Sequence, residues 1–249
     1  MSPAGDSAWA CESVEMTRPC SVVASWLTRA LSFGAIFLLL CTNAQAANNQ
    51  FQAWTPAYLN LAFNDKWNGW YEVQPRFSEE GVSQLLLRTA AGYRFYGNWS
   101  AWLGYAWTPN IQPKFQTENR IFQQLLWADD LSVGRLTSRT RLEQRWIGGA
   151  DGVAVRFRTL LRYQLPFTED KLWRGVAQDE IFVNLNSPEG GPVSGFDQNR
   201  IFFGVNRLVN EHLNVDVGYQ FQWVNRREPG FPDSANHVLL IQLFFDAAL

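Results

Sequence analysis

Lysine is nearly absent from this chain of 249 residues, which contains only Lys66, Lys114 and Lys171. Because lysine and arginine together number 21, arginine carries most of the positive charge, and its planar guanidinium favours fixed, forked hydrogen bonds to carboxylates. Acidic residues number 23 and the net charge is -2, so the chain lacks the basic excess of a nucleic-acid-binding domain. We therefore expect acids to balance the arginines locally, and we expect no nucleic-acid partner.

Cysteine and histidine are also scarce. Cys11, Cys20 and Cys41 all lie within the first 46 residues, which excludes disulfides and thiolate metal sites from the rest of the chain. The two histidines, His212 and His237, are distant in sequence and match no metal or hydrolase motif. We predict no metal, no cofactor and no catalytic residue, and an outer-membrane hydrolase is the least favoured function.

The apolar run at residues 30–41 is too short to span a bilayer comfortably. Arg18 and Arg29 precede this run and Ala44-Gln45-Ala46 follows it. A basic region, an apolar region and a small-x-small site in this order are typical of a secretory signal peptide. We predict that residues 1–46 are a signal peptide cleaved after Ala46.

The predicted mature domain is residues 47–249. The mean hydropathy of the whole chain is -0.20, which excludes a helical membrane protein. A short transmembrane anchor is the alternative to the signal peptide, and it is less favoured because the run is about half the usual spanning length. Translation from Met16 would give a more conventional signal, which makes residues 1–15 a candidate mis-called start.

Alternation of apolar and polar residues continues through almost the whole mature domain. In residues 153–165, for example, Val155 and Phe157 alternate with Arg156 and Arg158. This period of two predicts β-strands with one apolar and one polar face. Eleven such segments lie near 51–63, 69–78, 83–95, 99–108, 118–128, 132–147, 153–167, 174–186, 198–208, 213–224 and 236–246. Most have the length of about nine to eleven residues that a tilted strand needs to cross a bilayer.

The connections alternate between short turns such as Gly97-Asn98 and longer loops near 109–117, 187–197 and 225–235. This plan predicts an all-β fold, a single antiparallel transmembrane β-barrel that follows the cleaved signal peptide. Bacterial single-chain barrels use even strand numbers, so we expect about 12 strands, with 10 as the second choice. Eleven segments then require a twelfth strand near 47–55, one segment that is two strands, or a first segment outside the wall.

Tryptophan distinguishes the barrel from a secreted β-sandwich, which would show the same alternation. The chain contains 12 tryptophans, and many lie at or near the ends of predicted strands, where an indole reaches the lipid headgroup layer. The predicted membrane-interface girdle is Trp67, Trp70, Trp99, Trp107, Trp127, Trp146, Trp173 and Trp223.

The arginine-rich face of the strands is assigned to the barrel interior and the apolar face to lipid. The arginines predicted to line the lumen and bind anions are Arg76, Arg88, Arg120, Arg139, Arg141, Arg145, Arg156, Arg158, Arg162 and Arg200. The predicted counter-charges in the lumen are Glu72, Glu118, Glu143 and Glu180. These arginines outnumber the acids, and such an excess requires water, anions or loop carboxylates nearby.

Several short motifs carry a resemblance to a known family. They are Glu72-Val-Gln-Pro-Arg76, Leu85-Leu-Leu-Arg88, Gly92-Tyr93, Glu118-Asn-Arg-Ile-Phe-Gln-Gln124, Arg139-Thr-Arg-Leu-Glu-Gln-Arg145, Arg156-Phe-Arg158, Arg162-Tyr163, Glu180-Ile-Phe-Val-Asn-Leu185 and Phe196-Asp-Gln-Asn-Arg200. Together they make the chain resemble a family of uncharacterised bacterial outer-membrane proteins classed as a domain of unknown function. The resemblance implies a β-barrel in the outer membrane and no established activity.

The favoured function is a narrow channel or binding pore for small anionic solutes, because rings of arginine give pores a preference for anions. The alternative is a structural barrel whose interior is plugged by paired arginine and glutamate, without transport. The expected location is the bacterial outer membrane. The expected partners are outer-membrane lipid and lipopolysaccharide, the barrel-assembly machinery during insertion, and small anionic solutes.

Overall fold

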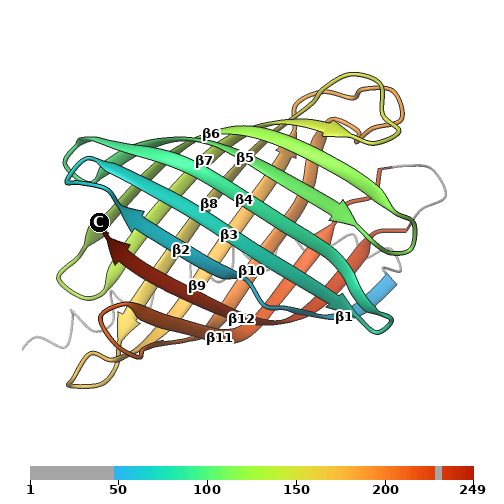
Figure 1. Cartoon of the computed structure of the whole chain (residues 1–249). Coiled ribbons are helices and arrows are strands. Elements are labelled where there is room, and N and C mark those ends of the chain that lie inside the picture. Colours follow the sequence, from blue (N-terminus) through green and yellow to red (C-terminus); the bar gives the residue numbers. More distant parts are fainter. Residues whose placement is uncertain (1–47, 228–231) are drawn as a thin grey trace, which may run out of the picture. The chain divides into compact units, whose positions relative to one another are not determined.

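A computed structural model describes residues 48–227 and 232–249, and the predicted signal peptide lies outside these residues. The regular structure of the described residues is entirely β, which confirms the all-β part of the predicted fold class, and it comprises the twelve strands drawn in Figure 1. They are β1 (Asn48–Trp54), β2 (Ala57–Ala62), β3 (Trp67–Ser78), β4 (Gly81–Tyr96), β5 (Trp99–Asn110), β6 (Gln116–Asp130), β7 (Arg135–Ile147), β8 (Ala154–Pro166), β9 (Trp173–Asn184), β10 (Gly195–Leu208), β11 (Leu213–Val224) and β12 (Ser234–Ala248). Within this part of the chain, no helix combines the length and apolar character needed to cross a membrane.

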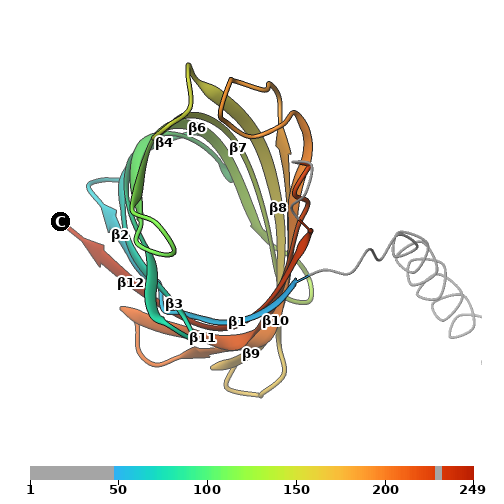
Figure 2. The same cartoon turned by 90° about the vertical axis from the view of Figure 1, so that its right-hand side faces the viewer.

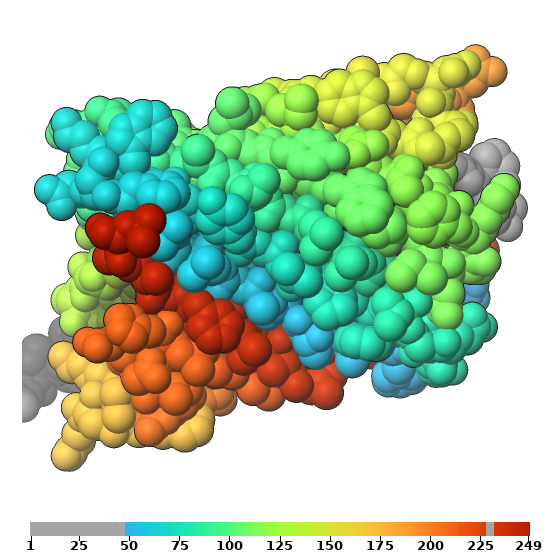
Figure 3. Space-filling view, in the orientation of Figure 1, coloured from blue at the N-terminus to red at the C-terminus, as the bar shows by residue number. Residues whose placement is uncertain are grey.

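The strands close into one barrel, seen along its interior in Figure 2. From β3 to β12, each strand pairs with the next in antiparallel orientation. The short strands β1 and β2 both pair antiparallel with β3 and parallel with β12. In Figure 3 the red end of the chain accordingly runs beside its blue beginning. In the described residues β1 and β2 share one place in the wall, which gives eleven wall positions.

The closed barrel and its twelve strands are confirmed, and the alternative in which one expected segment is two strands is the one observed. The wall is not fully antiparallel and has eleven positions instead of an even number. The first expected segment, 51–63, is two strands, because Thr55 and Pro56 separate β1 from β2 and proline has no N–H to donate to a ladder. The Pro56 carbonyl still accepts a hydrogen bond of 2.9 Å from Leu243 N, which holds residues 55–56 beside β12. An odd number of wall positions makes the first and last strands run in the same direction, so a parallel pairing closes the barrel.

The connections lie at two ends of the barrel. At one, which we call the turn end, they are 63–66, 97–98, 131–134, 167–172 and 209–212; at the other, the loop end, they are 79–80, 111–115, 148–153, 185–194 and 225–233. The two longest connections are therefore at the loop end, although the two-residue hairpin 79–80 also belongs there. Gly97 has a φ of +48° in its tight turn, a backbone conformation that glycine adopts without steric cost.

The two faces of the wall differ sharply in polarity. Successive residues of a strand face opposite sides, so Phe202 is fully buried inside while Phe203 is 61% exposed outside. Large apolar side chains such as Leu103 are exposed on the outer face, whereas Arg141 and Glu143 are buried within the barrel. A water-soluble protein has the opposite distribution, with apolar groups inside and charges at its surface.

Polar side chains on the outer face of β6 to β10 bond to one another. Gln123 and Gln144 exchange two amide hydrogen bonds of 3.1 Å. Asn199 donates from Nδ2 to the Asp179 carboxylate at 2.5 Å. Such pairing lowers the free-energy cost of placing polar groups on an apolar surface.

Candidate functional site

The arginines assigned to the interior lie together on the inner wall. All ten line a central cavity of about 750 Å3: Arg76, Arg88, Arg120, Arg139, Arg141, Arg145, Arg156, Arg158, Arg162 and Arg200. Three of the four glutamates assigned as counter-charges, Glu72, Glu118 and Glu180, line the same cavity. The fourth, Glu143, is only 1% exposed and lies among the arginines of β7 and β8.

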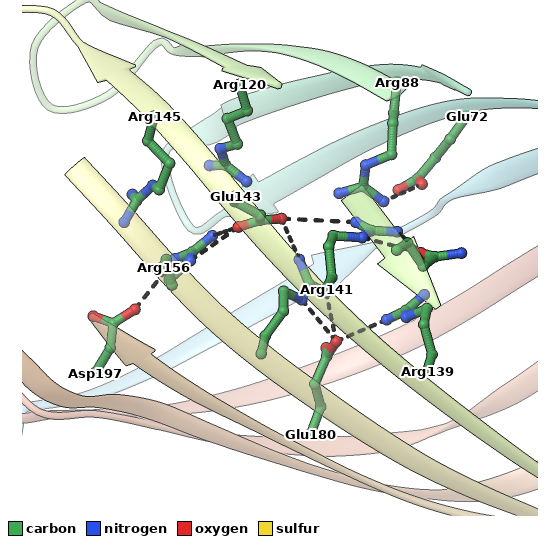
Figure 4. A network of polar contacts seen from close by, with 12 residues as sticks. Glu72, Arg88, Arg120, Arg139, Arg141, Glu143, Arg145, Arg156, Glu180 and Asp197 are labelled. Atoms are coloured by element: carbon green, nitrogen blue, oxygen red, sulfur yellow. Dashed lines mark hydrogen bonds and ion pairs between the residues drawn. The ribbon is translucent and has the colours of Figure 1, made fainter. Parts of the chain in front are cut away.

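The strand register explains why these arginines need glutamates between them. Arg141 of β7 lies directly opposite Arg158 of β8, and Arg120 of β6 lies directly opposite Arg145 of β7. Like charges at such positions destabilise a sheet. A glutamate two residues along the same inner face compensates each pair, Glu143 for the first and Glu118 for the second. Figure 4 shows the Glu143 carboxylate among the guanidinium groups of β7 and β8.

Glu143 contacts three arginines. The distances are 2.7 Å from Arg156 NH2 to Oε2, 3.1 Å from Arg158 NH1 to Oε1, and 3.7 Å from Arg141 NH1 to Oε1. The carboxylate is thus held by forked, charge-assisted hydrogen bonds of the kind that arginine forms better than lysine.

Glu180 extends this network through Arg158, and Glu118 forms a second group on the same inner wall. Glu180 Oε1 accepts from Arg158 NH2 at 2.6 Å and from Arg139 NH2 at 2.7 Å. Glu118 accepts from Arg120 Nε at 2.7 Å and from Arg145 Nε at 2.5 Å. Glu143 and Glu180 are joined through Arg158, whereas Glu118 forms a separate group with Arg120 and Arg145. We call these two neighbouring groups of glutamates and arginines on β6 to β9 the ion-pair ladder.

Two aspartates add ion pairs: the alternation of β11 turns Asp216 inward, whereas alternation did not place Asp197 in the lumen. Asp216 contacts Arg162 NH2 at 2.7 Å, and Asp197 contacts Arg156 NH1 at 3.2 Å. Asp197 follows the outward parity of β10, but the register shifts between Phe196 and Gln198, so parity fails there. Period-two reasoning contains no signal for such a bulge.

Arg76 differs from the arginines of the ladder. Within the described part of the chain it has no carboxylate within 4.0 Å, and its NH2 group donates to the amide of Gln74 at 3.2 Å. Its guanidinium carbon lies 3.7 Å from the ring centre of Trp54, a cation–π contact. Its Nε is buried without a hydrogen-bond partner among the described residues, a feature shared with Nε of Arg139 and NH1 of Arg141, so the missing carboxylate is what sets Arg76 apart.

Arg200 adjoins the same indole ring, with its guanidinium carbon 5.1 Å from the Trp54 ring centre. Its one ion pair among the residues described is with Glu180, at 4.0 Å, and its Nε is also buried without a partner. We call Arg76, Arg200 and Trp54 the open arginine group. The sequence assigned both arginines to the lumen but assigned no role to Trp54.

A second cavity of about 560 Å3 lies at the loop end. Residues that line both cavities form what we call the neck: Trp54, Arg76, Gln84, Asn110, Gln222 and Arg226. None of these six described residues is acidic. The neck therefore places two guanidinium groups, those of Arg76 and Arg226, between the loop-end cavity and the central cavity.

The predicted tryptophan girdle divides into seven residues that follow the outward register and one that does not. Trp67, Trp99, Trp127 and Trp173 lie near the turn end, and Trp107, Trp146 and Trp223 lie near the loop end. Trp70 is the correction, because it lines the central cavity and its Nε1 donates to Glu72 at 3.3 Å. Trp70 is two residues from Glu72 on β3, so both side chains point to the inside of the barrel although Trp70 lies near a strand end.

The two histidines lie away from the lumen. His212 is in the turn 209–212 and contacts Glu211 at 3.4 Å, with both side chains largely exposed. His237 lies on the outer face, where it stacks on Phe51 and its Nδ1 is 2.6 Å from the Tyr219 hydroxyl. Among the described residues, no group of three or more histidine, cysteine, aspartate and glutamate side chains is placed to hold a metal.

Comparison with known proteins agrees with the resemblance seen in the motifs. An uncharacterised protein from Methylorubrum extorquens is 34% identical over 182 residues, which covers 70% of this chain and 78% of that protein. No solved structure matches the chain. A family model described as a protein of unknown function (DUF2490) matches residues 51–231, and the chain belongs to this family.

Proposed function

We propose that this protein is an integral outer-membrane barrel whose wet, electropositive interior binds small anionic solutes and lets them pass. The apolar outer face supports membrane insertion, because a transmembrane barrel presents apolar side chains to lipid. Aromatic side chains near both ends, such as Trp99 and Trp146, would then lie at the two lipid headgroup layers, in contact with lipid and lipopolysaccharide. Insertion would use the barrel-assembly machinery.

The observation that carries the proposal is the charge of the inner wall. In the described residues, the ten predicted arginines face six acids: Glu72, Glu118, Glu143, Glu180, Asp197 and Asp216. A dry interior with this excess would hold uncompensated charge at a cost of several kcal/mol per ion, on the order given by continuum estimates. A lumen that contains water and exchangeable anions removes this cost, and rings of arginine then favour anions.

The proposal is tested with the purified barrel, residues 47–249, in a planar bilayer. We expect discrete conductance steps, and a KCl gradient should give a reversal potential on the side that indicates chloride permeation. Protein denatured before addition is the control. Absence of conductance, or conductance without anion preference, would contradict the channel.

The second candidate is a structural barrel with a plugged interior, and the ion-pair ladder favours it. The single carboxylate of Glu143 contacts three arginines, Arg141, Arg156 and Arg158. Such a network fills and stiffens the lumen between β6 and β9 without transport. An impermeable barrel in the bilayer experiment would support this function in place of the channel.

A further inference from the structure

We infer that the neck and the adjoining Arg200 form a binding site for oxyanions, in which Arg76 holds the carboxylate or phosphate group of a solute. This inference rests on the proposed function and names the place and ligand class within it. Arg76 is the inner-wall arginine of the predicted set that lacks an ion pair in the described part of the chain. Arg76 lines both cavities, which places it where they adjoin.

Trp54 orients the Arg76 side chain. The indole is only 2% exposed and its Nε1 donates to Gln52 at 2.9 Å, so the ring is fixed. Stacking on this fixed ring holds the guanidinium plane, and the hydrogen bond to Gln74 occupies NH2. The Nε is buried, as is the Nε of Arg88 and of Arg139 on the same wall, so an anion in the cavity would bind at NH1, which forms no hydrogen bond to a described residue.

Arg200 supplies a second donor group against the same ring. Its side chain is 13% exposed, so it remains accessible from the central cavity that it lines. NH2 donates to Gln198 at 3.3 Å, while Nε has no partner among the residues described. Two guanidinium groups adjoin one indole, and the one carboxylate near them among the described residues is Glu180, 4.0 Å from Arg200, so they provide more donors than the nearby acceptors use.

The other polar groups of the neck favour an oxyanion over a halide. Gln84 donates to the side-chain oxygen of Asn110, which leaves the Asn110 Nδ2 group as a donor in the neck. Forked guanidinium and amide donors match the several oxygen atoms of carboxylate or phosphate. The exposed acids Glu79 and Glu80 of the hairpin 79–80 line the loop-end cavity but not the neck or the central cavity.

Inorganic phosphate is the probe. Isothermal titration of the detergent-refolded barrel, residues 47–249, should show saturable phosphate binding, and phosphate should reduce the chloride conductance in bilayers. Arg76→Gln should weaken both effects about tenfold or more, because a charge-assisted hydrogen bond is lost. Arg76→Lys, which keeps the charge but loses the fork, should bind phosphate more weakly than the wild type.

Arg207→Gln is the matched control. Arg207 also stacks on a tryptophan, Trp173, at 4.9 Å, but it lies at the turn end outside both cavities, so its substitution should leave phosphate binding unchanged. Heat-modifiable gel migration verifies that every variant folds. Equal phosphate binding by Arg76→Gln and wild type, or no binding by the wild type, would overturn the inference.

The two proposals fail in different ways. Phosphate binding that depends on Arg76 in a barrel without conductance would contradict transport and support the site. Anion-selective conductance that ignores both phosphate and the substitution of Arg76 would support the channel and contradict the site.

Discussion

The ion-pair ladder and the open arginine group lie on the same inner wall and use the same residue type, yet their surroundings differ. In the ladder, each carboxylate is shared by two or more guanidinium groups at distances down to 2.5 Å. In the open arginine group, Arg76 has an aromatic ring and an amide where the ladder has glutamates. An arginine that is neutralised contributes to the architecture of the barrel, and one left without a counter-charge remains available to a ligand.

The largest difference should appear in stability when the ladder is broken. Glu143→Gln keeps the shape of the side chain but leaves Arg141, Arg156 and Arg158 without their shared carboxylate. The free energy of unfolding should fall by about 3–5 kcal/mol, because removing the carboxylate leaves buried positive charge uncompensated. Urea titration in detergent, followed by tryptophan fluorescence, measures the change. An unfolding midpoint equal to that of the wild type would mean that water already compensates these arginines.

Salt should separate the two regions by function. Raising KCl from about 0.1 to 1 M shortens the Debye length from about 10 to 3 Å, which screens the water-exposed charge of the neck. The anion-to-cation permeability ratio should fall severalfold, as measured from reversal potentials at constant gradient. The urea midpoint should shift little, because the buried ladder is screened less. A permeability ratio independent of salt would argue that selectivity does not come from the neck charges.

Stability should respond weakly to Arg76. Arg76→Gln removes one hydrogen bond and a cation–π contact, but it also removes a charge with no ion pair among the described residues. These effects offset one another, so the free energy of unfolding should change by no more than about 1 kcal/mol. The same urea titration provides the value. A loss as large as that of Glu143→Gln would place Arg76 in the architecture instead of the ligand site.

The smallest effect is expected at the exposed pair of Asp130 and Arg135, 3.0 Å apart at the turn end. Both side chains are well exposed, so water already solvates them. Asp130→Asn should lower the free energy of unfolding by about 0.5 kcal/mol or less. A larger loss in the urea titration would show that surface ion pairs contribute to this barrel as much as buried ones.

Much of the fold followed from period two, because a strand exposes alternate residues to opposite sides whatever its neighbours are. The number of wall positions did not follow, since the break at Pro56 and the parallel closure against β12 depend on pairing between the two ends of the chain. The even strand number of bacterial barrels led to the twelve strands observed but not to the eleven wall positions. Trp70 shows that parity was the better guide than closeness to a strand end.

For the candidate site, the sequence predicted which side chains point inward but not which of them pair. Parity placed the arginines and glutamates on one face, but the choice of partners depends on the register between strands, which alternation does not encode. Arg76 and Arg158 were equivalent in sequence, and only the register revealed that one has no carboxylate beside it while the other has two. Asp197 was missed because a bulge reverses its parity.

The central claim is that the arginine face borders water while the apolar face borders lipid. Residues 47–249 contain no cysteine, so single cysteines can be placed cleanly at Arg76 and Phe203. In liposomes, a membrane-impermeant, negatively charged thiol reagent should modify Arg76→Cys rapidly and leave Phe203→Cys unmodified. Rapid modification at position 203, with position 76 protected, would contradict the account.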